Sequence, residues 1–249
     1  MAHEPFQRVV QDSHTAIIMI HGIIGTPDHF LDFIPLVPQN WSIYNILLDG
    51  HGAGVRAFAQ TSMDKWKRQV STLVECLASQ YDHILIAAHS MGTLFAIEQA
   101  VYHQPKICGL FLMGSCLQIG LKPLALINAF KVSTGWIRPD DQPAMAARRA
   151  CSIDADRRFW QYLGWLPRYW ELLREIPPVR RLVCQLQIPC LVLQSRQDEM
   201  VSPKASQWFE GYPHIHCSFL DHSTHFHYSP SDQLCLLQAF SGFCRQFCT

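Results

Sequence analysis

The stretch Ala88–Gly92, with the sequence AHSMG, has the residue types and spacing of a serine nucleophile held in a sharp turn. It follows an apolar run at residues 82–87 and precedes residues 93–100, which have helical character. A serine at such a strand-to-helix turn sits on strained backbone with its hydroxyl presented for attack. The N–H of Met91 would lie at the start of a helix, where unpaired donors and the helix dipole stabilise an anion. The pattern G-x-S-x-G differs here only at its first position, where a small alanine still lets strand and helix approach.

Ser90 needs a base, and the base needs an acid to orient it, because a serine hydroxyl is a weak nucleophile at neutral pH. In an open α/β sheet these partners lie in loops that follow the carboxyl ends of strands. Asp198 follows the apolar run 191–194 and is the candidate acid. The alternative for Asp198 is a loop aspartate that caps the next helix. Glu199 is the nearest substitute, and we expect it to be mostly solvated.

Three histidines crowd the loop after the last strand-like run, so the base has to be chosen among them. His225 is the candidate, because it has room on both sides to turn back over the sheet. His222 stays an alternative although it is close to the strand end. His227 also stays an alternative, but the chain there runs toward a helix that begins at Pro230.

The loop His21–Pro27 follows the first clear strand and supplies the second donor that an oxyanion needs. Its glycines let the backbone turn so that an N–H faces the site. We expect the N–H of Ile23 to pair with that of Met91, and preorganised donors of this kind commonly stabilise a developing alkoxide by several kcal/mol. Gly22 and Ile24 flank this donor and are expected to contact the substrate. The side chain of His21 is expected to hold the loop by hydrogen bonding, and His89 to point away from Ser90.

Short apolar runs alternate with helical patterns along most of the chain, which predicts an α/β fold with a mostly parallel, doubly wound sheet. A helix over residues 63–79 places Trp66 and Val70 on one face. Another helix begins at Ser229-Pro230, and we expect it to bury Leu234, Leu237, Phe240 and Phe243. The strand-like runs are residues 15–20, 43–48, 84–88, 107–113, 189–194 and 214–220.

Residues 116–187 contain no convincing strand and hold four of the seven tryptophans. This predicts a helical cap inserted between two late strands, over a core made of residues 1–115 and 188–249. Two lysines and nine arginines face six acids here, so this segment is about +5 and the remainder about −5.

The apolar side chains of the predicted cap are candidates for the lining of an acyl pocket. The residues that we assign to it are Leu121, Leu124, Trp136 and Trp165. Ordinary packing between cap helices is the alternative. The basic excess would attract anionic substrates or lie near lipid headgroups. Solvated helix faces also explain it.

Composition and motifs exclude several classes of function. The 249 residues carry 20 basic and 20 acidic side chains, which argues against a nucleic-acid binder. The glycine-rich loop Asp49–Gly54 lacks the lysine and the spacing of a phosphate-binding loop. We expect neither a metal nor an organic cofactor, and the oligomeric state is not predicted.

No signal peptide or membrane-spanning run of about 20 apolar residues is found, so stable membrane insertion is not expected, although peripheral lipid contact is compatible with the sequence. The ten cysteines form no C-x-x-C pair and are read as reduced thiols of a cytoplasmic protein.

The order Ser90, Asp198, His225, together with the loops His21-Gly22 and Gly50-His51-Gly52, resembles the α/β-hydrolase superfamily over nearly the whole chain except the cap. Within it the chain resembles small bacterial carboxylesterases and monoacylglycerol-lipase-like serine hydrolases. The resemblance implies hydrolysis of small-molecule carboxylic esters of small or medium acyl chains through an acyl-enzyme. A thioesterase, amidase, C–C bond hydrolase or cofactor-free haloperoxidase would use the same three residues. A non-catalytic binding protein of this fold usually lacks one of them.

Overall fold

The computed structural model describes residues 3–102, 106–156 and 158–248. A seven-stranded sheet has the strand order β1-β3-β2-β4-β5-β6-β7. Each neighbouring pair is parallel except β1 with β3. The predicted α/β fold with a mostly parallel sheet is therefore confirmed. The strands are β1 (Phe6–Arg8), β2 (Thr15–Ile20), β3 (Ser42–Ile46), β4 (His83–His89), β5 (Ile107–Met113), β6 (Cys190–Ser195) and β7 (Ile215–Leu220).

Strand β1 was not predicted because it has no apolar run. It spans three residues at the edge of the sheet, two of them exposed. The other strands follow the predicted runs to within a few residues. All six residues of β2 are buried, since helices cover both faces of the sheet.

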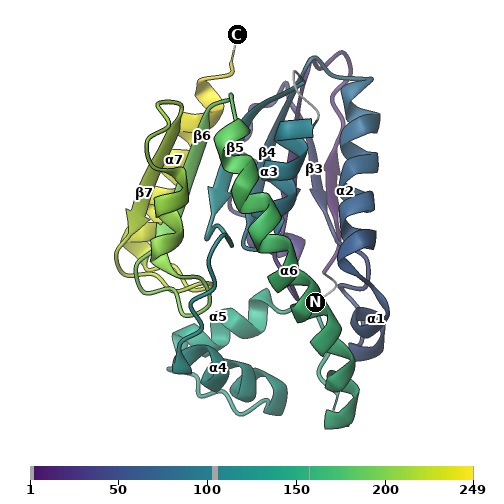
Figure 1. Cartoon of the computed structure of the whole chain (residues 1–249), viewed down its shortest axis with the longest axis vertical. Helices are drawn as coiled ribbons and strands as arrows, with labels where there is room; N and C mark the ends of the chain where they lie inside the picture. Colours follow the sequence, from purple (N-terminus) through teal and green to yellow (C-terminus); the bar gives the residue numbers. More distant parts are fainter. Residues whose placement is uncertain (1–2, 103–105, 157, 249) are drawn as a thin grey trace.

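Alternate residues of each central strand enter two separate apolar clusters. Ile18 and Ile86 belong to the cluster beneath α2 (Met63–Ala78), α3 (Gly92–Tyr102) and α6 (Leu166–Leu182). Ile17 and Leu85 belong to the cluster beneath α7 (Pro230–Arg245). The sheet thus lies between two layers of helices, with the loops of the site at its strand ends (Figure 1).

Two of the predicted helices form, and Phe240 and Phe243 of the second are buried as predicted, but one of its predicted core residues is not. Ser62 caps α2 and the predicted Trp66 face is buried. Ser229 caps α7 as predicted, yet Leu234 is 58 % exposed, and Leu236 is buried instead. The cause is Asp232, whose carboxylate accepts the His222 N–H at 2.7 Å and the Ser223 hydroxyl at 2.6 Å. This tie fixes the rotation of α7 and turns Leu234 to solvent.

Helices fill the chain between β5 and β6, and no strand occurs among its described residues. They include α4 (Pro123–Thr134) and α5 (Gln142–Ala150), which lie beyond one end of the sheet, whereas α6 returns across it (Figure 1). Leu172 and Ile176 of α6 join the core cluster, so α6 belongs to the core layer as well. The limits of the cap as a unit stay a prediction. The shorter helices are α1 (Val55–Gln60), η1 (Pro27–Phe30), η2 (Ile34–Leu36), η3 (Phe159–Trp165), η4 (Val183–Gln185) and η5 (Pro203–Phe209).

Two sequence features outside the core can be compared with the structure. None of the helices in the described ranges is long and apolar enough to cross a membrane. All ten cysteines are free thiols, and four of them are exposed: Cys76, Cys184, Cys235 and Cys248.

Candidate active site

Ser90 occupies the predicted sharp turn between β4 and α3. Its φ of +53° lies in the left-handed region, which a non-glycine residue adopts only under strain. Its N–H donates to the Met113 carbonyl at 2.9 Å, which anchors the turn to β5. A Cβ at Gly92 would lie 2.4 Å from the carbonyl oxygen of Ile20, so glycine is required where α3 leaves the sheet.

The structure brings Ser90, His225 and Asp198 together in one hydrogen-bonded chain. The Ser90 Oγ is 3.0 Å from the His225 Nε2, and the His225 Nδ1 is 2.7 Å from the Asp198 Oδ2. Because a carboxylate only accepts, Nδ1 carries the proton and Nε2 is free to accept from the serine hydroxyl. None of the three residues is more than 5 % exposed. This arrangement can remove a proton from Ser90.

Asp198 contacts the histidine ring and holds its own turn, whereas the next helix, η5, is capped by Ser202 rather than by Asp198. Its Oδ1 accepts the N–H groups of Met200 at 2.8 Å and Val201 at 2.7 Å, which holds the turn after β6. Its Oδ2 remains for His225. The two turn contacts therefore fix the carboxylate that orients the histidine ring.

Glu199 is not solvated as we expected. It is 2 % exposed, and its Oε2 accepts the backbone N–H of His225 at 2.9 Å. The reason for the correction is that the turn held by Asp198 folds back under the histidine loop. Two adjacent acids after a strand were the available signal, but the loop that covers them is 26 positions away in the sequence.

Of the three stacked or adjacent histidine rings beside Ser90, the electrostatic environment favours protonation of His225. Burial opposes a charge on His225, but the charge of Asp198, its hydrogen bond and the charge of Glu199 together raise the pKa of His225. Burial, aided by the charges of neighbouring histidines, lowers the pKa of His89 well below its ordinary value and that of His29 to about 3. These two rings therefore stay neutral beside the base.

His89 and His29 were not predicted as neighbours of the base. Their rings stack with centroids 3.9 Å apart, and the His89 ring lies 4.7 Å from that of His225. The His89 Nε2–H donates to the His225 carbonyl at 3.2 Å. This bond ties the histidine loop to the residue that precedes Ser90.

The two alternative bases lie elsewhere in the loop. His222 is exposed, and its N–H donates to Asp232. The N–H of His227 donates to the hydroxyl of Thr224 at 3.2 Å, and neither ring is bonded to Ser90. Within the described ranges, no group of three or more His, Cys, Asp or Glu side chains is arranged to hold a metal ion.

The loop after β2 is held against Ser90. The His21 Nε2 accepts the Leu48 N–H at 3.1 Å, and its Nδ1–H donates to the Gly22 carbonyl at 2.8 Å, as predicted for a loop-holding residue. A Cβ at Gly22 would lie 2.7 Å from that of Ser90. Ile24 has a φ of +51°.

The two predicted oxyanion donors are both available. Ile23 and Met91 are buried in the loops on either side of Ser90. No acceptor in the described part of the chain takes the N–H of either residue. Two free donors beside a buried serine can stabilise an alkoxide.

The predicted acyl-pocket residues differ in their surroundings, and their contact with substrate stays a prediction. Trp136 is 82 % exposed, and Leu121 and Leu124 are exposed as well. Gly135, with a φ of +74°, ends α4 and turns the chain outward at Trp136. Trp165 is half-buried and packs against Phe58 of α1 at 4.9 Å between ring centroids.

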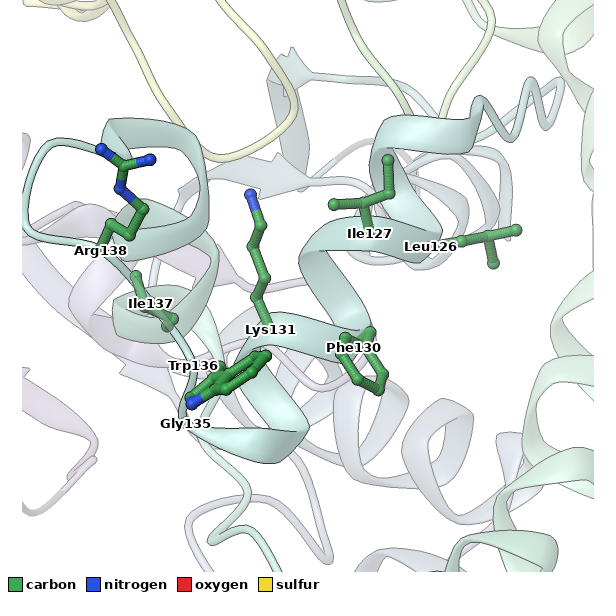
Figure 2. A pocket seen from close by; sticks show the side chains of 8 residues that line it. All are labelled: Leu126, Ile127, Phe130, Lys131, Gly135, Trp136, Ile137 and Arg138. Atoms are coloured by element: carbon green, nitrogen blue, oxygen red, sulfur yellow. The ribbon is translucent and has the colours of Figure 1, made fainter.

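Trp136 instead lines an open groove of about 660 Å³ on the cap (Figure 2). The groove carries apolar side chains and two cations. Its lining residues are Leu126, Ile127, Phe130, Lys131, Gly135, Trp136, Ile137 and Arg138.

Both ends of the segment that carries α4 and α5 are bonded to loops of the site. Where the chain enters the cap, Ile119 forms an antiparallel bridge with Val201, and the Lys122 N–H donates to the Glu199 carbonyl at 2.8 Å. Where it leaves α5, the Ser152 N–H donates to the Ile24 carbonyl at 2.9 Å. The position of α4 and α5 is thus linked to the acid loop and to the loop after β2.

A family model described as serine aminopeptidase S33 matches residues 11–227, a range that contains all three hydrogen-bonded residues. The chain belongs to this family of α/β hydrolases. None of the curated proteins matches the sequence of this hydrolase.

Solved structures share the fold of this hydrolase at low sequence identity. One of the metagenome-derived lipolytic enzymes LipS and LipT matches with a TM-score of 0.74 and 17 % identity, covering 98 % of both chains. The monoacylglycerol lipase of Paleococcus ferrophilus matches with a TM-score of 0.70 and 14 % identity, covering 97 % of this chain and 99 % of its own. The monoglyceride lipase of Saccharomyces cerevisiae matches with a TM-score of 0.68 and 15 % identity, covering 97 % and 91 %.

Proposed function

We propose that this hydrolase cleaves carboxylic esters of small or medium acyl chains through an acyl-enzyme formed on Ser90. The observation that carries the proposal is the chain of hydrogen bonds from the Ser90 Oγ through His225 to Asp198. Lipases are among the proteins of similar fold, which supports an ester as the substrate.

Acylation begins when His225 removes the Ser90 proton and the Oγ attacks the acyl carbon. The N–H groups of Ile23 and Met91 stabilise the oxyanion that develops on the former carbonyl oxygen. Asp198 stabilises the imidazolium of His225. As the intermediate collapses, His225 gives its proton to the leaving alcohol, and the acyl group stays on Ser90.

Deacylation repeats these steps with water. His225 takes a proton from the water, the resulting hydroxide attacks the acyl carbon, and the same two donors hold the second oxyanion. The C–O bond to Ser90 then breaks, and His225 returns the proton to the Ser90 Oγ. The products are the free acid and the regenerated enzyme.

A fluorophosphonate probe tests the nucleophile directly. We expect labelling of the wild type and none of Ser90→Ala. Ser115→Ala is the matched control, because Ser115 is equally buried near α3 but its hydroxyl bonds to Thr93 rather than to His225. An unlabelled wild type, or labelling that persists in Ser90→Ala, overturns the proposal.

A panel of substrates tests the bond that is cleaved. We expect p-nitrophenyl esters of short and medium chains to be hydrolysed faster than long ones. The matching thioesters and anilides serve as the comparison at equal acyl length. A protein that labels with the probe but prefers thioesters or anilides would belong to the thioesterase or amidase alternative.

We also infer that the cap contacts the surface of an anionic lipid membrane that presents ester substrates. Exposed apolar side chains occur on α4, on the loop after it, on η3 and at the start of α6, and α4 and the start of α6 lie at one end of the molecule (Figure 1). Exposed apolar surface of this extent marks interaction sites. The exposed residues are Leu121, Leu126, Ile127, Phe130, Trp136, Trp160, Leu163, Leu166 and Trp170.

The positive charge of the cap favours a membrane surface with anionic headgroups. Ion pairs neutralise Asp140, Asp141, Asp156, Glu171 and Glu175, five of the six acids of residues 116–187. Among the described residues, Lys122, Arg148 and Arg149 have no such partner. The remaining positive charge is complementary to anionic headgroups.

Co-sedimentation with vesicles tests this contact. We expect binding to vesicles that contain phosphatidylglycerol and weaker binding to pure phosphatidylcholine. Binding should weaken at 0.5 M salt, about three times the physiological ionic strength, because the charges are then screened. Equal sedimentation with and without vesicles at low salt contradicts a lipid-facing cap.

A further inference from the structure

Two consecutive acids hold the same histidine at two different points. The carboxylate of Asp198 accepts from the imidazole ring, and that of Glu199 accepts from the backbone N–H. The backbone carbonyl of Glu199 also accepts the N–H of Lys122, the residue that precedes α4. Glu199 therefore joins the acid turn, the histidine loop and the start of the cap.

The backbone bond alone does not explain why a carboxylate occupies this position. A neutral side-chain oxygen would accept the N–H of His225 equally well. Burying a charged carboxylate at 2 % exposure is unfavourable unless other groups compensate for the lost hydration. A positive charge that appears on His225 during the reaction would provide that compensation.

We propose that Glu199 is a positioning residue, which fixes the backbone of His225 and stabilises its imidazolium through charge. The inference rests on the proposed function, because the imidazolium forms only if His225 acts as the base. It assigns to the second acid a role that the hydrogen bond of Asp198 to the ring does not cover.

The other titratable groups near His225 carry no charge that could stabilise its imidazolium. His89 lies against the ring, with His29 stacked behind it, and burial lowers the pKa of both. Cys116 lies near Asp198, and burial raises the pKa of its thiol to about 12. Burial likewise raises the pKa of Tyr228. All four groups are neutral near pH 7, so the charges that act on His225 belong to Asp198 and Glu199.

The variant Glu199→Gln separates charge from hydrogen bonding. Its amide oxygen still accepts the His225 N–H, but the negative charge is lost. We expect the acidic limb of the kcat/KM profile to move to lower pH, and the plateau to fall by roughly 10-fold, against about 10⁴-fold for loss of the orienting acid itself. Glu199→Asp keeps the charge and should retain an acidic limb close to that of the wild type.

Asp221→Asn is the matched control. Asp221 lies in the same loop as His225, but it is exposed and paired with Arg196, so removing its charge should leave the acidic limb in place. Melting temperatures of all variants report on folding. If Glu199→Gln does not fold, Glu199→Asn removes the same charge and is measured in its place.

The outcomes separate this inference from the proposed function. An acidic limb that is identical in the wild type and the glutamine variant shows that Glu199 serves only the backbone, and it overturns the role of its charge. A limb that shifts equally in Asp221→Asn also overturns it. Failure of the wild type to label with the fluorophosphonate probe would instead remove the proposed function.

Discussion

The two oxygens of Asp198 divide the work of holding the base. Oδ1 is occupied by two backbone N–H groups, so rotation of the carboxylate would break two bonds. Oδ2 is thereby directed at the His225 ring. Asparagine has the same shape as Asp198 but no charge, and it would change which nitrogen of the His225 ring carries the proton. Substitution of Asp198 therefore tests the arrangement directly.

We predict that Asp198→Asn lowers kcat/KM by about 10⁴-fold while the fold is retained. The asparagine oxygen can still accept from Met200 and Val201, which turns its NH₂ group toward the His225 Nδ1. Nδ1 must then accept, so Nε2 carries the proton and cannot take the one from Ser90. Ester hydrolysis and the melting temperature are measured together, and a variant with more than a tenth of wild-type activity contradicts the role of Asp198.

We predict that kcat/KM of the wild type falls on the acidic side at a pH above 6.5, the ordinary pKa of histidine. His225 must be neutral to take the proton of Ser90, and its pKa is raised by the neighbouring carboxylates against the effect of burial. Protonation as the pH falls through that value removes the base. A pH–rate profile at constant ionic strength gives the midpoint, and a midpoint below 6.5 is incompatible with this environment.

Sequence reasoning located the residues whose partners follow from strand order. Ser90, Asp198 and His225 each come directly after an apolar run, and parallel strands bring their carboxyl ends to one edge. The contacts of Glu199, His89 and His29 with the histidine loop were not predicted, because they depend on how the loops fold over one another. Nothing in the local pattern of Glu199 distinguishes a buried acid from a solvated one.

At the scale of elements, the glycines of the loops set how closely β2 can approach β4 and α3. Gly92 faces the carbonyl of Ile20, and Gly22 faces the side chain of Ser90. A side chain at Gly92 would meet rigid backbone and disrupt the core. A side chain at Gly22 would meet the side chain of Ser90, so the loop after β2 that carries Gly22 can yield at the expense of its position.

We predict that Gly22→Ala lowers kcat by about 10²-fold or more with little loss of stability, because the added Cβ pushes the Ile23 donor out of place. Gly54→Ala is the control, since a Cβ there meets nothing within 4 Å in the neighbouring loop. Steady-state kinetics and thermal denaturation are compared for both. Equal activity of the two variants would show that this loop does not stabilise the oxyanion.

Strands were predictable from the sequence where helices bury both faces of the strand, because such strands are continuous apolar runs. Six strands were found from their apolar runs, whereas the edge strand β1 has no such run. The rotation of α7 depends on Asp232, which binds to a loop that no helical periodicity describes. In the cap, the turn at Gly135 directs Trp136 outward. The number of apolar residues in this segment does not predict which of them face solvent.

At the scale of the whole molecule, the segment that carries α4 and α5 is bonded to the loops of the site. The hydrogen-bonded residues around Ser90 are almost fully buried, whereas the apolar face of the cap is in solvent. The bonds of Lys122 to Glu199 and of Ser152 to Ile24 connect the two. A movement of α4 and α5 that admits substrate must therefore act on both the acid turn and the loop after β2.

We predict that Trp136→Ala reduces hydrolysis of an ester embedded in anionic vesicles by about 10-fold, because the ring no longer enters the interface. Hydrolysis of a dissolved short-chain ester should stay within about two-fold of the wild type, since the ring is 82 % exposed and its removal leaves no cavity. Leu234→Ala is the control, an exposed apolar residue on α7 outside the cap. Equal losses on both substrates would return Trp136 to the acyl pocket that its sequence first indicated, whereas a loss confined to vesicles assigns the outer face of the cap to the lipid surface.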